Sequence, residues 1–119
     1  MTPKQLVQEF YKSDAMLDSQ IIEPLLHDDL VVNWHSSKGF IEMNKAQVLS
    51  LLGELSQAYI RSKIRITHLL EEENSVAVKF SHFVKTFENP REEMLLAHFM
   101  VIWEIKDAKL YRGFQMSQL

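Results

Sequence analysis

The segment EMLLAHFMVIWEI, residues Glu93–Ile105, decides how the rest of the chain is arranged. Nearly every position in it is apolar, so it lacks the alternation of apolar and polar residues typical of a strand with one solvent-exposed face. The aromatic and β-branched residues from Phe99 to Ile102 favour a strand over a buried helix. We therefore expect a strand covered on both faces, with one histidine, His98, inside the apolar run.

Polar turns divide the second half of the chain into a meander of strands. These turns are Glu72-Glu73-Asn74, Asn89-Pro90-Arg91 and Lys106-Asp107-Ala108-Lys109. The residues between them predict strands at Lys63–Glu71, Ser75–Phe87, Glu93–Ile105 and Lys109–Met116. An earlier short strand is predicted at Leu30–Trp34, followed by a loop at Ser36–Gly39.

The first half of the chain carries signals for helix starts. The expected starts are Thr2, Asp18 or Ser19, and Asn44. Gln5 and Gln47 each follow a capping residue by three positions, which is the spacing of a capping box. Pro24 must interrupt the second helix, because proline has no amide proton and its ring clashes with the preceding turn. Helices followed by a strand meander define one α+β domain over residues 1–119, with the helices on one side of an antiparallel sheet.

Composition and charge exclude several classes of function. The 119 residues have a net charge of −3, and no dense basic block is present for binding nucleic acid. Arg61, Lys63 and Arg65 recur at every second position, which is typical of the solvated face of a strand. There is no cysteine for a disulfide or a thiolate metal site. No apolar run reaches the roughly 20 residues of a membrane span, and we expect a cytoplasmic protein without a membrane or nucleic-acid partner.

The turn at Asn89-Pro90-Arg91 predicts which residues face each other across the hairpin. If the turn is centred near Pro90, His82 lies opposite His98 and Phe80 lies opposite Met100. The same counting places His68 on this face. Because the face is mostly apolar, we expect the helices to cover it.

The opposite face of the sheet is then expected to be apolar over the last two strands. Its expected members are Phe99, Val101, Trp103, Phe114 and Met116. Left in water, they would form a patch of several hundred Å², roughly more than monomers usually expose. A two-fold homodimer through the outer sheet face would cover it. The alternative is that the C-terminal tail or a loop folds over the patch.

The order of elements resembles the nuclear transport factor 2-like superfamily, which includes SnoaL-like polyketide cyclases, ketosteroid isomerases and limonene epoxide hydrolases. The resemblance rests on Asp28-Asp29-Leu30-Val31-Val32 after two helices, Gly39-Phe40 before a third, and Trp103-Glu104-Ile105-Lys106-Asp107-Ala108-Lys109-Leu110 in the closing hairpin. It covers the whole chain. It implies a cone-shaped, cystatin-like roll, in which three N-terminal helices and a curved antiparallel sheet enclose a pocket. It also implies dimerisation through the outer sheet face.

The catalytic residues of that superfamily are not matched here. The ketosteroid isomerases of the superfamily use a tyrosine, an aspartate base and a buried carboxylic acid. The corresponding places in this chain hold Phe10 beside Tyr11, Asn33 or Trp34, and His98 to Met100. The epoxide hydrolases resemble one another in an Asp–Arg–Asp arrangement, and the predicted inner face carries no aspartate. Whether the chain is an enzyme is therefore left open.

The predicted pocket is apolar and contains histidine. The expected ligand-binding residues are Tyr11, Asn33, Trp34, Phe80, His82, His98 and Met100. Gln115 is a further candidate for a pocket amide. His82 and His98 are candidates for acid and base catalysis, or are core histidines bonded to neighbouring groups. They lack a third ligand for a metal, and no cofactor is expected.

Three functions follow from this pocket and the two sheet faces. The first is binding of an apolar or aromatic small molecule. The second is an isomerase, cyclase or dehydratase reaction that uses His82 and His98. The third is a dimeric interaction domain whose cavity has no catalytic role.

Overall fold

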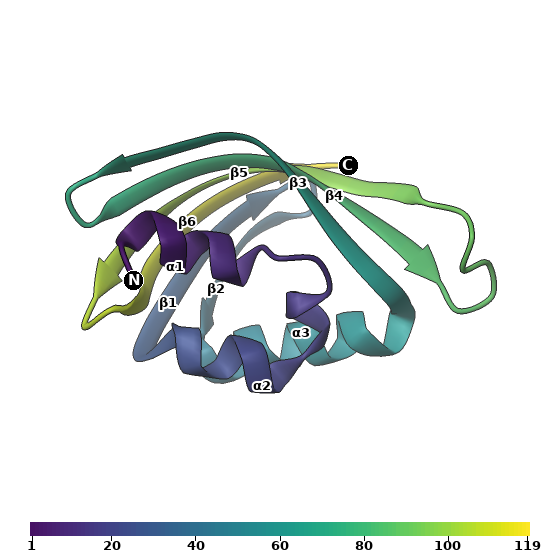
Figure 1. Cartoon of the computed structure of the whole chain (residues 1–119), viewed down its shortest axis with the longest axis horizontal. Helices are drawn as coiled ribbons and strands as arrows, with labels where there is room; N and C mark the ends of the chain where they lie inside the picture. The colour runs from purple at the N-terminus through teal and green to yellow at the C-terminus, as the bar shows by residue number, and fades with distance from the viewer.

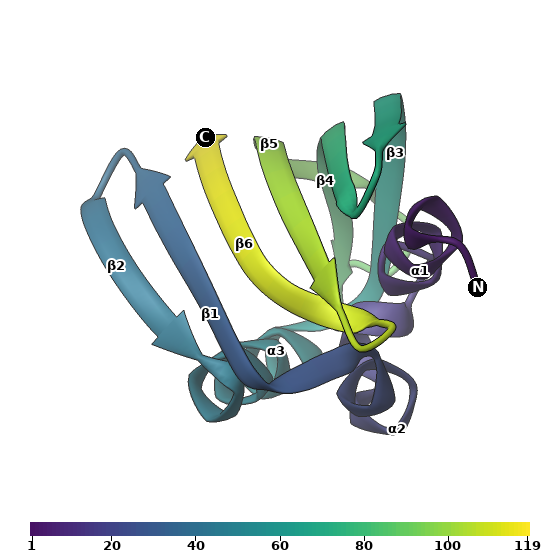
Figure 2. The ribbon, with the colours of Figure 1, turned by 90° about the vertical axis from the view of Figure 1, so that its left-hand side faces the viewer.

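In the computed structural model of residues 1–119, six strands form one curved sheet (Figures 1 and 2). The strands are β1 (Leu26–Ser36), β2 (Gly39–Asn44), β3 (Tyr59–Glu72), β4 (Ser75–Thr86), β5 (Met94–Lys106) and β6 (Lys109–Gln118). Their order across the sheet is β2-β1-β6-β5-β4-β3. The β1–β6 pair is parallel and the other pairs are antiparallel. The sheet is therefore mixed, which corrects the prediction of a wholly antiparallel one.

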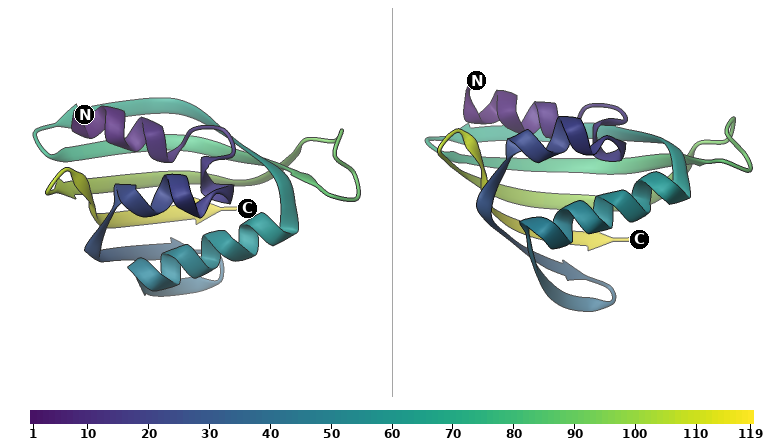
Figure 3. Two further views of the ribbon diagram at one scale, coloured as in Figure 1. Left: turned by 60° about the horizontal axis from the view of Figure 1, so that its bottom comes forward. Right: turned by 90° about the horizontal axis from the view of Figure 1, so that it is seen from below.

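Three α-helices cover the concave face of this sheet (Figures 1 and 3). They are α1 (Pro3–Phe10), α2 (Ser19–Ile22) and α3 (Lys45–Ala58), and two short 3-10 turns, η1 (Ala15–Leu17) and η2 (Glu23–Leu25), flank α2. This arrangement confirms the predicted α+β cone. No helix has the length and apolar character needed to cross a membrane.

The predicted helix signals operate as hydrogen-bonded caps. At the start of α1, Thr2 Oγ1 accepts from the Gln5 amide at 3.1 Å, and Gln5 Oε1 accepts from the Thr2 amide at 2.9 Å. Asn44 and Gln47 form the same reciprocal pair before α3. After α2, the chain passes into η2, which contains Pro24. Local sequence therefore sets where these helices begin and where the second one ends.

Strand β2 is an element that the sequence patterns did not reveal. Residues Gly39–Asn44 pair with β1, with Met43 opposite Val32 and Phe40 opposite His35. Only one residue of this strand is buried, so the segment shows no apolar alternation that would have predicted it. The loop before it, at Ser36–Gly39, was predicted. In the structure this loop connects β1 and β2 in an antiparallel hairpin.

The register between β4 and β5 differs by one residue from the prediction. His82 lies opposite Ala97, Phe80 lies opposite Phe99, and His98 lies opposite Ser81. A one-residue shift moves every side chain of a strand to the other face. The prediction that His82 and His98 face each other is therefore wrong, because the hairpin is not centred on Pro90.

The same shift reverses the predicted faces of β5. Phe99, Val101 and Trp103 point toward the helices, whereas Met100 and Ile102 are 61% and 51% exposed on the outer face. The prediction that the first three form the outer patch is therefore wrong. Phe114 and Met116 of β6 do lie on the outer face, opposite Ile102 and Met100.

A bulge in β3 has a similar effect on His68. Ile66 pairs with Phe80, but after the irregularity His68 pairs with Lys79 instead of Val78. His68 therefore lies on the outer face and is exposed. The prediction that it points inward is wrong for this reason.

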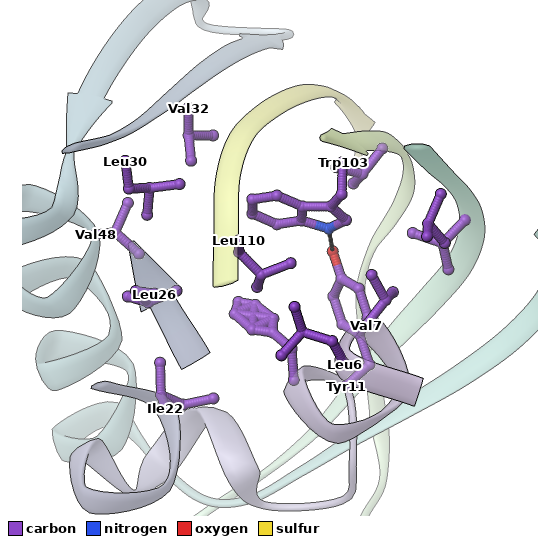
Figure 4. Packing of buried hydrophobic residues seen from close by; sticks show 14 of the residues in the cluster. Leu6, Val7, Tyr11, Ile22, Leu26, Leu30, Val32, Val48, Trp103 and Leu110 are labelled. Carbon is purple, nitrogen blue, oxygen red and sulfur yellow. Dashed lines mark hydrogen bonds between the residues drawn. The ribbon is translucent and has the colours of Figure 1, made fainter. Parts of the chain in front are cut away.

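The core lies between the sheet and the helices and centres on Trp103 (Figure 4). The indole is 3% exposed, packs edge-on against Phe10, and donates from Nε1 to the Tyr11 hydroxyl at 2.9 Å. Gly113 lies opposite Trp103 in the sheet, and a Cβ atom added there would lie 2.7 Å from the ring. Glycine is therefore required for the indole to pack directly on the β6 backbone.

Candidate functional site

An apolar cavity of about 160 Å³ lies inside the cone, between the sheet, α1, η1 and α3. Its wall residues are Phe10, Tyr11, Met16, Val32, Trp34, Met43, Val48, Leu51, Leu52, Leu55, Phe80, His82, Leu96, Phe99, Trp103 and Gln115. None of these side chains carries a carboxylate, an ammonium or a guanidinium group. The cavity therefore has an uncharged wall, with His82 and Gln115 as its main polar groups.

The cavity brings together some, but not all, of the predicted ligand-binding residues. Tyr11, Trp34, Phe80 and His82 line it, as does the candidate amide Gln115. Phe99 and Trp103, which were expected on the outer face, also line it.

Asn33, His98 and Met100 lie on the other side of the sheet, which contradicts their predicted place on the inner wall. Asn33 pairs with Phe114 on the outer face of β1. His98 Nδ1 lies 2.8 Å from Ser81 Oγ, and both side chains are outside the cone. For His98 and Met100 the cause is the register shift of β5. For Asn33 it is the alternation along β1, in which Trp34 and Val32 take the inner positions.

His82 has one protein partner, the hydroxyl of Ser62. His82 Nε2 and Ser62 Oγ are 2.7 Å apart, and the two residues are 4% and 2% exposed. Burial lowers the pKa of the His82 imidazole to about 4, because the charged form loses its hydration. The ring is therefore neutral near pH 7, and Ser62 determines how its two nitrogens are used.

Ser62 is held in place by backbone contacts that the sequence did not suggest. The Asp14 carboxylate accepts from the Ser62 amide at 2.9 Å, and the Asp14 amide donates to the Ser62 carbonyl at 2.7 Å. Asp14 adopts a left-handed conformation with φ of 65°. Ser62 lies two residues before Ile64 on the same inner face. A predicted strand that began before Lys63 would therefore have included Ser62 among the inner residues.

Two further hydrogen bonds shape the wall of the cavity. Trp34 Nε1 donates to Ser117 Oγ at 2.8 Å, which fixes this indole where β1 runs beside β6. Burial raises the pKa of Tyr11, so its hydroxyl stays protonated while it accepts from Trp103. These side chains are rigid and neutral, and they present aromatic faces to the cavity.

The outer face of the sheet carries a separate, wider groove of about 600 Å³. Its exposed apolar residues, which we call the outer patch, are Leu70, Met100, Ile102, Phe114 and Met116. His68 and Lys79 border the groove on β3 and β4. Arg61, Lys63 and Arg65 are exposed further along β3, as their spacing predicted.

Together, the cone of helices and sheet and the apolar cavity between them are typical of the nuclear transport factor 2-like α+β fold. Solved structures of this fold match almost the whole chain at low sequence identity. IdmH of Streptomyces antibioticus, a candidate polyketide cyclase, has a TM-score of 0.77 and 11% identity, covering 98% of this chain and 92% of IdmH.

Two further solved structures of this fold are of other kinds of protein. An LEH-like epoxide hydrolase of M. tuberculosis has a TM-score of 0.73 and 14% identity, covering 97% of this chain and 81% of the hydrolase. A protein of Catenulispora acidiphila with a ketosteroid isomerase-like fold, solved with trimethylamine, has a TM-score of 0.71 and 12% identity, covering 97% of this chain and 85% of that protein. No protein-family model and no curated protein matches the sequence. These similarities show the fold, and the same fold can carry different functions.

Proposed function

We propose that the protein binds an apolar or aromatic small molecule in the inner cavity. The observation that carries this proposal is a neutral, buried histidine in an uncharged and mostly apolar cavity wall. An apolar pocket with few polar groups is the usual form of a small-molecule site. The similar solved structures include cyclase-type and epoxide hydrolase proteins, which supports a role for the cavity in holding a small organic molecule.

A reaction that uses His82 and His98 together is not part of this proposal. The two rings lie on opposite faces of the sheet, so one substrate in the inner cavity cannot contact both. Tyr11 is the only other titratable side chain of the wall, and burial raises its pKa. Binding is therefore better supported than acid and base catalysis.

Filling the cavity is expected to abolish binding of a small ring. Leu96 is half-buried at a bulge of β5 and lines the cavity, so Leu96→Trp should occupy the space while the fold is kept. Met100→Trp, on the same strand but on the outer face, is the matched control. We expect wild type and Met100→Trp to bind fluorobenzene saturably in a ¹⁹F NMR titration, and Leu96→Trp to bind at least about 10-fold more weakly.

Two results of this titration would contradict the proposal. Absence of saturable binding to wild type would mean that the cavity does not accept a ring. Loss of binding in Met100→Trp, but not in Leu96→Trp, would place the site in the outer groove instead.

We also propose that the outer patch forms a two-fold homodimer interface. Five large apolar side chains of the patch are between 41% and 68% exposed, and four of them belong to the adjacent strands β5 and β6. Contiguous apolar surface of this kind usually marks an interaction site. A second copy of the same face is a self-complementary apolar partner, which is how two-fold interfaces form.

Charges placed in the outer patch are expected to dissociate this dimer. The double variant Ile102→Lys, Met116→Lys would bury four unpaired lysines in the interface, which should weaken association by about 100-fold or more. Ile21→Lys is the control, because Ile21 is 47% exposed on α2, which lies among the helices. Sedimentation velocity over a concentration series measures the change. A monomeric wild type, or a double variant that sediments as wild type does, would refute the interface.

A further inference from the structure

The size of the inner cavity limits what the proposed site can hold. Its volume is about 160 Å³. A dry, apolar cavity of about 150 Å³ in another protein accepts benzene, so this volume corresponds to a single six-membered ring with a small substituent. A fused ring system would have to extend through the open side of the cavity. This inference rests on the proposed binding function and defines the class of ligand.

The hydrogen bond to Ser62 determines which nitrogen of His82 carries the proton. Ser62 is 2% exposed, and its hydroxyl has His82 Nε2 as its only side-chain partner. If Nε2 were the donor, the Ser62 proton would be buried without an acceptor, which is the costlier arrangement. With Ser62 as donor, the buried hydroxyl proton is paired, and the ring proton lies on Nδ1, which is not fully buried. Nε2 is therefore the acceptor, and the proton of the neutral ring lies on Nδ1.

The Nδ1 atom of His82 is available to a ligand. The one hydrogen bond of the His82 ring is made by Nε2, and no protein group forms one to Nδ1. Asn33 Oδ1 is the only fully buried side-chain nitrogen or oxygen without a partner, so Nδ1 keeps some accessible surface. The space that His82 lines is the inner cavity. An N–H donor of His82 therefore faces a mostly apolar, uncharged cavity.

We propose that the ligand is a neutral, single-ring compound whose carbonyl or comparable oxygen accepts a hydrogen bond from His82 Nδ1–H, and that Ser62 is the positioning residue for this donor. A buried donor without an acceptor is costly, so an oxygen in this position is favoured over a hydrocarbon of the same shape. An anion is disfavoured, because the wall has no cation to compensate for its lost hydration.

Three probes of similar shape test the ligand class. Acetophenone supplies the acceptor, α-methylstyrene replaces its oxygen with a carbon, and benzoate carries a negative charge. Calorimetric titration of wild type is expected to show acetophenone binding roughly five- to ten-fold more tightly than α-methylstyrene, with no saturable binding of benzoate. The double variant Ser62→Ala, His82→Leu, which leaves no unpaired hydroxyl, should bind the two neutral probes equally.

A separate measurement tests the role of Ser62. Long-range ¹H–¹⁵N NMR distinguishes the protonated from the unprotonated ring nitrogen. In wild type at pH 7 we expect the His82 proton on Nδ1. In Ser62→Ala, which keeps the imidazole but removes the donor, we expect the Nε2–H form to appear and the preference for acetophenone to fall. A merely structural role for Ser62 would leave the tautomer unchanged.

The outcomes separate this inference from the proposed function. Equal binding of acetophenone and α-methylstyrene to wild type would overturn the proposal that a ligand oxygen accepts a hydrogen bond from His82, while the cavity would remain a binding site. Tighter binding of benzoate would overturn the requirement for neutrality. An Nε2–H tautomer in wild type would overturn the assignment of Ser62 whatever the probes do. Failure of both neutral probes to bind would contradict the proposed function itself.

Discussion

Trp103→Lys is expected to leave the protein largely unfolded at 25 °C. Removing a buried tryptophan costs about 3–5 kcal/mol, and a lysine in its place adds an unpaired buried charge. The indole is 3% exposed, packs against Phe10 and the backbone of Gly113, and is the partner of the Tyr11 hydroxyl. Because domains are stable by only about 5–15 kcal/mol, such a loss removes most of the native population.

The neighbouring residue provides the control for this prediction. Ile102→Lys changes an adjacent position of β5 that is 51% exposed on the outer face. We expect this variant to keep its near-UV circular dichroism and a cooperative unfolding transition. If Ile102→Lys unfolded the monomer and Trp103→Lys did not, the assignment of the two sheet faces would have to be exchanged.

Lowering the pH from 7 to 4 is expected to remove about 3 kcal/mol of stability through His82 alone. Burial lowers the pKa of this imidazole in the folded protein from 6.5 to about 4. Between these values, the unfolded chain binds a proton at His82 that the folded chain does not. The free energy of unfolding therefore rises with pH across this window, and the contribution of His82 is lost as the pH falls from about 6.5 to about 4.

Comparison with a variant isolates this effect from the other titrating groups. His82→Gln places a neutral amide beside Ser62, and we expect its stability to fall less than that of wild type between pH 7 and pH 4. Urea unfolding at several pH values measures the difference. Parallel curves for the two proteins would show that the imidazole titrates alike in the folded and unfolded states, and that it is not buried as described.

Much of the architecture could be predicted because it depends on local signals. The capping boxes at Thr2 and Asn44 define where α1 and α3 begin, and Pro24 ends the second helix in a 3-10 turn. Polar turns separate the strands from β3 to β6 close to where they were expected. These features involve residues a few positions apart, so the sequence contains the interactions that produce them.

The sheet partners of β1 could not be predicted in this way. Strand β2 has one buried residue and no clear pattern of apolar residues. Strand β1 pairs in parallel with β6, although most of the chain separates these two strands in the sequence. Such pairing depends on where the strands meet in space, because a parallel neighbour needs no turn to connect it.

Some residues of the candidate site could be predicted from the sequence and others could not. Tyr11, Trp34, Phe80 and His82 line the inner cavity as expected, because strong apolar neighbours identify the inner face of their own elements. Ser62 was missed because the strand was predicted to start at Lys63, whereas β3 begins at Tyr59. His98 was placed on the wrong face, although its strand was predicted correctly.

The sequence by itself determined the class of fold, the caps, the turns and the existence of an apolar strand at Glu93–Ile105. Only the tertiary structure decided which face of that strand is inside. Both of its faces are apolar, so hydrophobicity gives no preference for either register, and a shift of one residue exchanges the two faces. The choice is made by long-range packing, in which the indole of Trp103 fits against Gly113 and Tyr11.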